Sequence, residues 1–405
     1  MAVILRDALI FDGVGEETVA GDVTIDGGRI TCIDGAGRAA ADAGDMQIDL
    51  AGAVLIPGLI DAHVHLVWSG GPDPAETVAR EAEQLTTIRA AAHATAQLAA
   101  GITTVRDLGS NWDIAVSVAR SIDRGHIRGP TVIAAGRTVI MTGGHDPFWG
   151  IFSDGPDAIR SAVRRQWSIG AGVIKVAATG GVYGRSEGEA IGQTELTREE
   201  LAAASAEAHR LGLRVAAHAL GEEGIRNAVL AGIDTIEHGA FLTEDIIDAM
   251  AKRGTVLCPT LAVYKTIADG GDGTIPAYAT AKARTAVAAH RGSFVAAMEA
   301  GIPIIAGTDA GSCLTPHPAL PAELELMCSY GMTPAQALRA ATSEAARALG
   351  RADDLGRIAA GYRADLLVFD KNPLDDIGAV RDIATIFRAG ERVGEGTGIL
   401  LSARR

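Results

Sequence analysis

Short apolar runs alternate with longer amphipathic stretches along most of the chain. A helical stretch repeatedly stops at glycine and continues within a few residues into a β-branched run, as in AGITTV (100–105), LGLRVAAH (211–218), AGIDTIEH (231–238), RGTVLCPT (253–260) and AGIPIIAGTD (300–309). Glycine directly after a helix accepts the left-handed conformation that ends it, and a short apolar run is typical of a buried parallel strand. The pattern therefore predicts repeated strand–helix units.

Three further segments complete the expected strands. IPGLIDAHVHL (56–66), TVIAAGR (131–137) and AGVIKVAA (171–178) bring their number to eight, separated by amphipathic segments such as 75–100 and 197–211. Eight βα units over about 300 residues predict an α/β fold with a (β/α)8 TIM-like barrel, which we place at residues 56–355. A doubly wound open sheet is the alternative, because counting strands does not show closure. No G-x-G-x-x-G follows the first strand to support nucleotide binding there.

Both ends of the chain have a different pattern. Residues 1–55 and 356–405 contain short strand-like runs without helical stretches between them, and Asp26-Gly27-Gly28 has the character of a hairpin turn. Gly361 and Gly390 mark similar turns near the other end. We expect the two ends to pair into one small β-sandwich domain that is discontinuous in sequence.

Composition excludes several classes of protein. The chain has 36 Lys plus Arg against 50 Asp plus Glu, a net charge of -14 that repels nucleic acids and anionic membranes. No uncharged apolar run is long enough to span a bilayer, and residues 1–13 lack the features of a secretory signal, so we expect a cytoplasmic location. The four cysteines are far apart without a C-x-x-C, which predicts free thiols.

Ionisable residues gather where the predicted strands end. Barrel enzymes carry their chemistry at the carboxyl ends of the strands. Asp61-Ala62-His63-Val64-His65 ends the first strand, and alternation along a strand places both histidines on one side. The other strand-end groups are Lys175 on strand four, His218 on strand five, His238 on strand six and Asp309 after strand eight.

Each of these groups has an ordinary explanation when it is taken alone. A strand-end histidine is often simply hydrogen bonded, a buried lysine is usually ion-paired, and an aspartate after a strand often caps the next helix. Together, six such residues on five strands, with four imidazoles and a carboxylate among them, predict a site for a divalent metal, most simply zinc. His145 and His317 lie on loops over the same end of the barrel and are candidates for substrate contact.

These residues, in this order, resemble the amidohydrolase superfamily of metal-dependent hydrolases. The resemblance rests on PGLIDAHVHL, VIKVAATGG, RVAAHAL, TIEHGA and AGTDAG, and it extends to LGRIAAGYRADLLVFDKNP near the end of the chain. TTVRD, TGGH, AATGG and EHG narrow it to the branch of imidazolonepropionase-like proteins, Xaa-Pro and Xaa-Arg dipeptidases and ochratoxin-type amidases.

The resemblance implies two metal ions and a role for each strand-end residue. His63, His65 and Asp309 would hold the first metal, and His218 and His238 the second. Lys175 would bridge them as a carbamate (N6-carboxylysine), because a bare ammonium cannot ligate. A bridging hydroxide would attack a carbonyl, and Asp309 would take the proton and deliver it to the leaving nitrogen.

Two further implications concern the substrate and the assembly. His145 would stabilise the oxyanion or hold a substrate carboxylate, and the superfamily habit implies a homo-oligomer. One feature departs from the dipeptidases, in which the strand-five histidine is followed by Ala-Tyr. Here the sequence is His218-Ala219-Leu220. Tyr183 and Arg185, on the segment after strand four, are candidate replacements.

Three functions follow from these observations. The first is a binuclear amidohydrolase that cleaves a C–N bond in a small molecule such as a dipeptide, N-acyl amino acid, carbamate or urea. The second is a mononuclear deaminase or cyclic-imide hydrolase of the imidazolonepropionase kind, for which Lys175 would not be needed. The third is a non-catalytic scaffold of the same fold, which intact ligands argue against.

Overall fold

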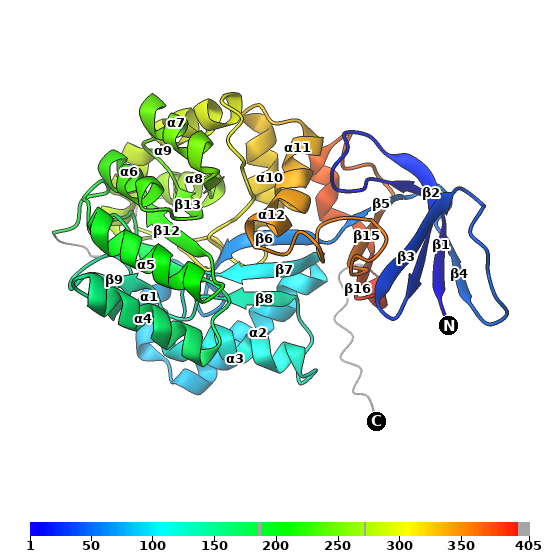
Figure 1. Ribbon diagram of the computed structural model, residues 1–405, viewed down its shortest axis with the longest axis horizontal. Helices are drawn as coiled ribbons and strands as arrows, with labels where there is room; N and C mark the ends of the chain where they lie inside the picture. Colours follow the sequence, from blue (N-terminus) through cyan, green and yellow to red (C-terminus); the bar gives the residue numbers. More distant parts are fainter. Residues whose placement is uncertain (185–187, 271–272, 396–405) are drawn as a thin grey trace.

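Parallel strands surrounded by helices form the body of the molecule (Figure 1). The computed structural model describes residues 1–184, 188–270 and 273–395. Two runs of parallel pairing join β6–β7–β8 and β9–β11–β12–β13–β14. The strands are β6 (Leu59–Val64), β7 (Ile102–Asp107), β8 (Thr131–Ala134), β9 (Val139–Ile140), β11 (Ile174–Ala177), β12 (Val215–Ala219), β13 (Thr235–His238) and β14 (Val256–Cys258), with β10 (Ile151–Phe152) beside β9.

Backbone contacts join the two runs into a closed ring. On one side the amide of Gly172 donates to the carbonyl of Ala134 at 2.8 Å, and Val176 pairs with Val139, so β8 and β9 act as one interrupted strand beside β11. On the other side residues 303–310 lie between β14 and β6, through parallel bridges from Ile304 to Leu257 and from Ala310 to Val64. The (β/α)8 barrel predicted from the sequence is therefore the observed architecture.

The eighth strand differs from its expected form. Residues 303–310 occupy the position between β14 and β6 but make only isolated bridges, at Ile304 and Ala310. Pro303 has no amide hydrogen to donate, and Asp309 has a φ of +56°, which a regular strand does not allow. The segment therefore closes the barrel as an irregular connection. At Asp309 the backbone leaves the extended conformation, so this side chain does not follow the alternation of a regular strand.

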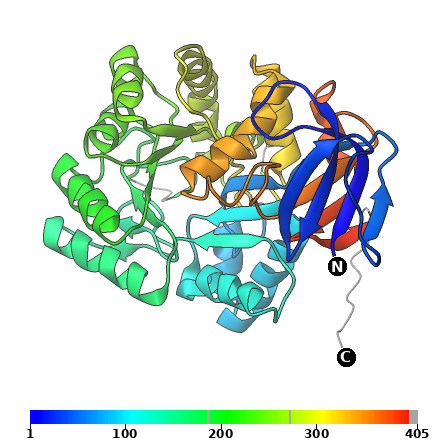
Figure 2. The same cartoon turned by 45° about the vertical axis from the view of Figure 1, so that its right-hand side comes forward.

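Helices cover the outside of the barrel, as Figures 1 and 2 show. Their bounds are α1 (Pro74–Arg80), α2 (Glu83–Ala99), α3 (Ile114–Asp123), α4 (Pro156–Ile169), α5 (Arg198–Arg210), α6 (Glu222–Leu230), α7 (Glu244–Arg253), α8 (Leu261–Asp269), α9 (Ala277–Glu299), α10 (Leu320–Ser329), α11 (Pro334–Ala340) and α12 (Ser343–Ala348). The glycine stop signals are confirmed. Gly212 after α5, Gly254 after α7 and Gly301 after α9 have φ values of +76°, +69° and +71°.

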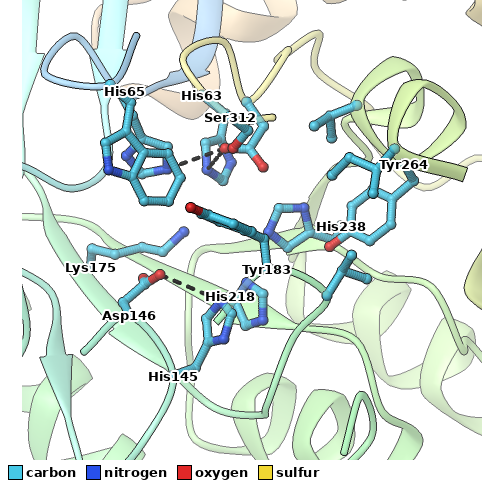
Figure 3. Close-up of a pocket in the computed structure, with 15 residues that line it drawn as sticks. His63, His65, His145, Asp146, Lys175, Tyr183, His218, His238, Tyr264 and Ser312 are labelled. Atoms are coloured by element: carbon cyan, nitrogen blue, oxygen red, sulfur yellow. Dashed lines mark ion pairs between the residues drawn. The ribbon is translucent and has the colours of Figure 1, made fainter. Parts of the chain in front are cut away.

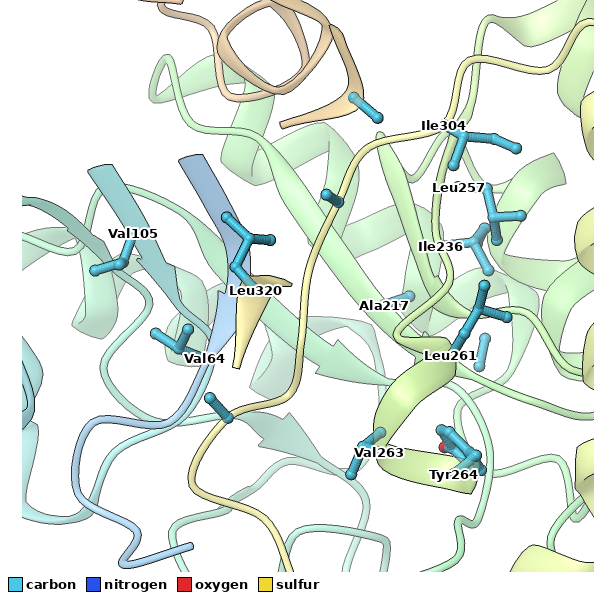
Figure 4. Packing of buried hydrophobic residues seen from close by; sticks show 14 of the residues in the cluster. Val64, Val105, Ala217, Ile236, Leu257, Leu261, Val263, Tyr264, Ile304 and Leu320 are labelled. Atoms are coloured by element: carbon cyan, nitrogen blue, oxygen red, sulfur yellow. The ribbon is translucent and has the colours of Figure 1, made fainter. Parts of the chain in front are cut away.

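Aliphatic side chains fill the space between strands and helices. Val105 on β7, Ile236 on β13 and Leu257 on β14 are completely buried and belong to one large apolar cluster (Figure 4). The buried β-branched and leucine residues of these strands explain why the strands appear in the sequence as continuous apolar runs. This core leaves the strand ends as the place where buried polar side chains meet.

One sheet combines strands from both ends of the chain. Its order is β17–β16–β15–β5–β1–β2–β3, with β4 paired to β1. These strands are β1 (Val3–Ile10), β2 (Val19–Asp26), β3 (Arg29–Gly35), β4 (Met46–Asp49), β5 (Val54–Pro57), β15 (Leu366–Phe369), β16 (Ile383–Arg388) and β17 (Glu391–Glu395). The two ends meet where β5 pairs antiparallel with β15.

The sheet has its own apolar core and leads directly into the barrel. Leu5, Val23, Leu55, Leu366 and Phe387 share a buried cluster separate from the main one. Gly27 and Gly28 form the expected hairpin turn between β2 and β3, with φ values of +55° and +79°. Only Gly58 separates β5 from β6, so the sheet is anchored to the first barrel strand. The division at residues 55/56 and 355/356 stays a prediction.

Two expectations from composition can be compared with the structure. All four cysteines, Cys32, Cys258, Cys313 and Cys328, are free, as predicted. In the described part of the chain, no helix combines the length and apolar character that crossing a membrane requires.

Candidate metal centre

All six predicted strand-end residues line one cavity at the carboxyl ends of the barrel strands. They are His63, His65, Lys175, His218, His238 and Asp309. Figure 3 shows the imidazoles of His63, His65 and His238 and the Lys175 side chain directed toward a common space. The strand ends therefore bring together residues that are up to 246 positions apart in the chain, from His63 to Asp309.

His63, His65 and Asp309 form the tightest group. Oδ1 of Asp309 lies 3.2 Å from Nε2 of His65 and 3.6 Å from Nε2 of His63. This oxygen is buried, yet it makes no hydrogen bond of acceptable geometry with any residue that the structure describes. Buried polar atoms are normally hydrogen bonded, so convergent ligand atoms without hydrogen bonds fit a shell that holds a cation.

His218 and His238 complete the ring of imidazoles. Their ring centroids are 4.7 Å apart, and that of His238 lies 5.2 Å from the centroid of His63. Burial, together with neighbouring cationic groups, lowers the pKa of His63, His218 and His238 well below the ordinary value. These imidazoles are therefore neutral at physiological pH, which is the form that ligates metals.

Lys175 stands between the two groups. Its side chain is 2% exposed, and it has no hydrogen bond or ion pair with residues 1–184, 188–270 or 273–395. Burial lowers the pKa of its amine, partly offset by the charges of Glu237, Asp146 and Asp309. A buried ammonium without a direct partner is unfavourable, which sets Lys175 apart from the usual structural lysine.

Two ligand-type residues have an unusual backbone. His238 and Asp309 have φ values of +71° and +56°, a region that residues other than glycine seldom adopt. Such conformations persist where surrounding contacts determine them, and they concentrate at functional sites. Here the left-handed turn directs both side chains into the cavity at the point where each strand ends.

Hydrogen bonds fix the imidazoles from behind. Nδ1 of His63 lies 2.9 Å from Oε2 of Glu237, Nδ1 of His65 lies 3.1 Å from the carbonyl of Gly109, and Nδ1 of His238 lies 2.7 Å from Oγ1 of Thr260. With Nδ1 engaged in this way, Nε2 is available to the cavity. His290 on α9, to which the sequence assigned no role, donates from Nε2 to the carbonyl of His238 at 3.0 Å.

Glu237 supports the candidate site, and the sequence did not single it out. It is completely buried, and its carboxylate accepts hydrogen bonds from Arg106 at 2.8 Å and Thr235 at 2.5 Å in addition to His63. It could have been found from the sequence, because it directly precedes the strand-end residue His238 in the TIEH phrase. Glu237 and His238 are neighbours on β13. Glu237 supports His63 from the barrel interior, whereas His238 faces the cavity.

Replacing Glu237 by glutamine is expected to destabilise the protein by about 3–5 kcal/mol and to weaken metal binding about 10- to 100-fold. The exchange leaves the buried guanidinium of Arg106 without its carboxylate and removes the charge that orients His63. Urea denaturation and metal titration measure the two effects. Glu222→Gln, which alters the exposed pair of Glu222 with Arg226, is the control and should change stability by less than about 1 kcal/mol.

His145 lines the same cavity, but both of its ring nitrogens face carboxylates. Nδ1 lies 2.6 Å from Oε1 of Glu189, and Nε2 lies 3.4 Å from Oδ1 of Asp146. Burial opposes protonation, but the charges of Asp146 and Glu189 outweigh it and raise the pKa of His145 to about 8. The ring stacks on His218 at 3.9 Å, and a Cβ at Gly181 would lie 2.3 Å from His145 Cε1, so this stack requires glycine there.

Two other residues that the sequence predicts as substrate contacts are His317 and Arg185. His317 is not among the side chains lining the cavity. Its Nδ1 lies 2.8 Å from Gln97 Nε2 and its Nε2 lies 3.2 Å from the carbonyl of His65. It therefore supports the loop after β6 from behind, because these two bonds use both of its nitrogens. Arg185 lies outside the described residues.

Tyr183 lines the cavity, but its hydroxyl is already engaged. It donates to the carboxylate of Asp73 and accepts from the amide of Ala75 at 3.1 Å. Tyr264 on α8, which the sequence did not single out, also lines the cavity and is 3% exposed. Its hydroxyl has no hydrogen-bond partner in the described structure, and Figure 3 shows it directed toward the imidazoles.

Comparison with known proteins assigns the chain to a family. A model described as the amidohydrolase family matches residues 54–393. The chain belongs to the amidohydrolase family. Members of this family generally use divalent metals and act on small molecules, and the chain is accordingly a hydrolase of carbon–nitrogen bonds. The resemblance inferred from the sequence motifs is confirmed.

Individual amidohydrolases cover most of the chain. Ochratoxinase from Aspergillus niger is 31% identical over 391 residues, covering 85% of this chain and 76% of that protein. Imidazolonepropionase from Shouchella clausii is 26% identical over 396 residues, covering 87% and 79%. A crystal structure of a Xaa-Pro dipeptidase with bound methionine superposes with a TM-score of 0.91 at 31% identity, covering 98% of this chain and 100% of that one.

Proposed function

We propose that this amidohydrolase is a binuclear metal-dependent enzyme that hydrolyses an amide-type C–N bond in a dipeptide, N-acyl amino acid, carbamate or urea. The observation that carries the proposal is Lys175, a buried amine without a direct partner in the described structure, between His63, His65 and Asp309 on one side and His218 and His238 on the other. A mononuclear site would need no lysine at this position.

The donor set fits two divalent ions, most simply zinc. His63, His65 and Asp309 would hold the first ion, and His218 and His238 the second, because neutral imidazoles and a carboxylate are ordinary ligands of such ions. Bound there, the two ions supply Lewis acidity that polarises a carbonyl and activates water. The uncommitted Oδ1 of Asp309 and the depressed pKa values of three histidines support this assignment.

Lys175 would take part as a carbamate. A neutral amine attacks carbon dioxide, forms an N–C bond and releases a proton, which gives a carbamate with one negative charge shared by two oxygens. Burial favours the neutral amine that this reaction requires. The product would remove the unpaired buried cation and offer one oxygen to each side of the site.

Asp309 would transfer the proton of the attacking water. Its carboxylate accepts that proton and delivers it to the leaving nitrogen, which cannot depart as an anion. Burial raises the pKa of Asp309, but the close approach of His65 and the positive charges nearby outweigh it and keep the pKa below the ordinary value. The ionised form needed for the first transfer is thereby maintained. His145 lines the same cavity and would stabilise the oxyanion if its Nε2 turns from Asp146 to the substrate.

Replacing Tyr264 by phenylalanine is expected to lower kcat about 10- to 100-fold with little effect on metal content. Its hydroxyl faces the cavity and is available to the carbonyl oxygen of a substrate, whereas the hydroxyl of Tyr183 is bound to Asp73. Steady-state kinetics with any hydrolysed compound measures the effect. Tyr183→Phe is the matched control, and a larger loss in that variant than in Tyr264→Phe would reverse the two assignments.

Similar proteins support the choice of substrate classes. An ochratoxinase and a Xaa-Pro dipeptidase, both enzymes that we take to cleave amide-type bonds, align with 85% and 98% of the chain. Leu220 stands where the dipeptidase motif described above has tyrosine. This is why the proposal includes carbamates, ureas and N-acyl compounds along with dipeptides.

Metal content and intact mass test the proposal together. Protein purified without chelator or affinity-tag metal is analysed for metals per chain, and its mass is measured under native conditions. About two ions per chain and one added carbon dioxide support the binuclear site. One ion without carboxylation favours the mononuclear imidazolonepropionase-like alternative. Failure to retain or rebind any metal contradicts the binuclear and the mononuclear enzyme and favours the non-catalytic scaffold.

A further inference from the structure

Asp146 places a second carboxylate in the cavity, away from Asp309. It follows His145 directly and lies on the loop after β9, where its φ is +61°. Its side chain is 9% exposed and is among those that line the cavity. In Figure 3 the Asp146 carboxylate lies between the side chains of Lys175 and His145 and faces the shared space. Neither the family assignment nor the proposed mechanism uses this group.

The contacts of Asp146 hold its charge in place. Oδ1 lies 3.4 Å from Nε2 of His145, and Oδ2 accepts a hydrogen bond from the hydroxyl of Thr138 at 3.3 Å. The Asp146 carbonyl accepts from the amide of Trp149 at 3.3 Å, which fixes the loop. Glu189 occupies the other nitrogen of His145 at 2.6 Å. The imidazole is therefore held between two carboxylates.

This arrangement changes what His145 can bind. A substrate carboxylate that approached Nε2 of His145 would have to displace Asp146 and then lie beside it, and such like-charge contacts are strongly unfavourable in a poorly solvated site. Among the described residues that line the cavity there is no arginine, and Lys175 belongs to the proposed metal site. Apart from Ser312, the rest of the described wall is aromatic or aliphatic, with Trp68, Val182 and Val263 among its members.

We propose that Asp146 is a specificity-determining residue that excludes a carboxylate from the position beside His145 and accepts a hydrogen bond from a substrate N–H group there. The preferred substrates are then amides, carbamates or ureas whose group at this position is an uncharged amide or an ammonium, not a free carboxylate. The inference deepens the proposed function, on which it rests. It separates dipeptides and N-acyl amino acids, which carry free carboxylates, from their neutral derivatives.

Matched substrate pairs test the role of Asp146 in the metal-loaded enzyme. The pairs are N-acetyl amino acids with their carboxamides, and dipeptides with their C-terminal amides. The wild type is expected to hydrolyse the carboxamide member with a kcat/KM at least about tenfold higher. Asp146→Asn keeps the shape and tolerates the left-handed backbone, and it should reduce that ratio about tenfold. Asp157→Asn removes an exposed carboxylate at the start of α4 and should leave the ratio unchanged.

Two further measurements keep this inference separate from the proposed function. Metal content should be the same in wild type and Asp146→Asn, because a loss of metal would identify Asp146 as a ligand and overturn the specificity role. Isothermal titration of the same pairs should show tighter binding of the carboxamides to the wild type. Equal or tighter binding of the carboxylates, or binding of neither member, overturns the inference. Absence of hydrolysis of every compound counts against the proposed function, and the titration then decides the role of Asp146.

Discussion

Replacing Lys175 by alanine is expected to reduce the metal content from two ions per chain to one and to lower kcat by about a thousandfold or more. Lys175 is the group that lies between the two sets of ligands, and its Nζ has no hydrogen bond or ion pair in the described structure. Without a bridge, His218 and His238 are left as two neutral ligands, too few to hold a second ion tightly. Elemental analysis and steady-state kinetics measure both losses.

Lys175→Arg distinguishes a carbamate from an ordinary buried cation. Arginine keeps the positive charge, but its guanidinium is always protonated and does not react with carbon dioxide. If Lys175 acts as a carbamate, the arginine variant loses the second ion and the activity as the alanine variant does, and neither shows the mass of an added carbon dioxide. Full activity with unchanged metal content in either variant contradicts the binuclear mechanism.

Replacing Asp309 by asparagine is expected to lower kcat about a thousandfold on substrates with poor leaving groups, while at least one metal ion is retained. An amide cannot accept the proton of water or pass it to the leaving nitrogen. The imidazoles of His63 and His65, fixed by Glu237 and the Gly109 carbonyl, remain in place to hold the ion. Kinetics normalised to metal content separates proton transfer from metal loss.

A series of anilides with different leaving groups tests this role of Asp309. An activated anilide departs without full protonation, so Asp309→Asn should lose less activity on a nitroanilide than on an unsubstituted anilide. An equal loss on both would show that Asp309 acts through metal binding alone. Retention of more than about a tenth of the wild-type kcat on the poor leaving group would exclude it as the proton carrier.

The barrel could be predicted because its signals are local. Gly212, Gly254 and Gly301 end helices through a backbone conformation that depends on their own chemistry, and continuous apolar runs mark buried parallel strands wherever they occur. The pairing of both chain ends into one sheet followed from their hairpin patterns. The irregular eighth segment was not predicted, because its backbone at Asp309 depends on contacts with β6 and β14.

The substrate contacts were the least predictable part of the site. His145 and Tyr183 were correctly expected near the cavity, but the carboxylates that occupy their polar atoms come from Glu189 and Asp73, 44 and 110 positions away. His317 contacts Gln97 and the carbonyl of His65 through its two ring nitrogens, and its expected contact with substrate stays a prediction. No spacing rule relates such loop residues, since each loop conformation is set by the loops around it.

The sequence by itself determined the residues available for metal chemistry and the end of the barrel at which they gather, because strand alternation and strand direction are properties of the local chain. Only the tertiary structure decided which polar atoms remain free. Glu237 contacts Nδ1 of His63, Asp73 accepts from the hydroxyl of Tyr183 and Asp146 contacts Nε2 of His145. The amine of Lys175 and the hydroxyl of Tyr264, by contrast, have no hydrogen-bond partner among the residues that the structure describes. Hydrogen bonds act over about 3 Å, so they depend on packing between segments that are distant in the chain.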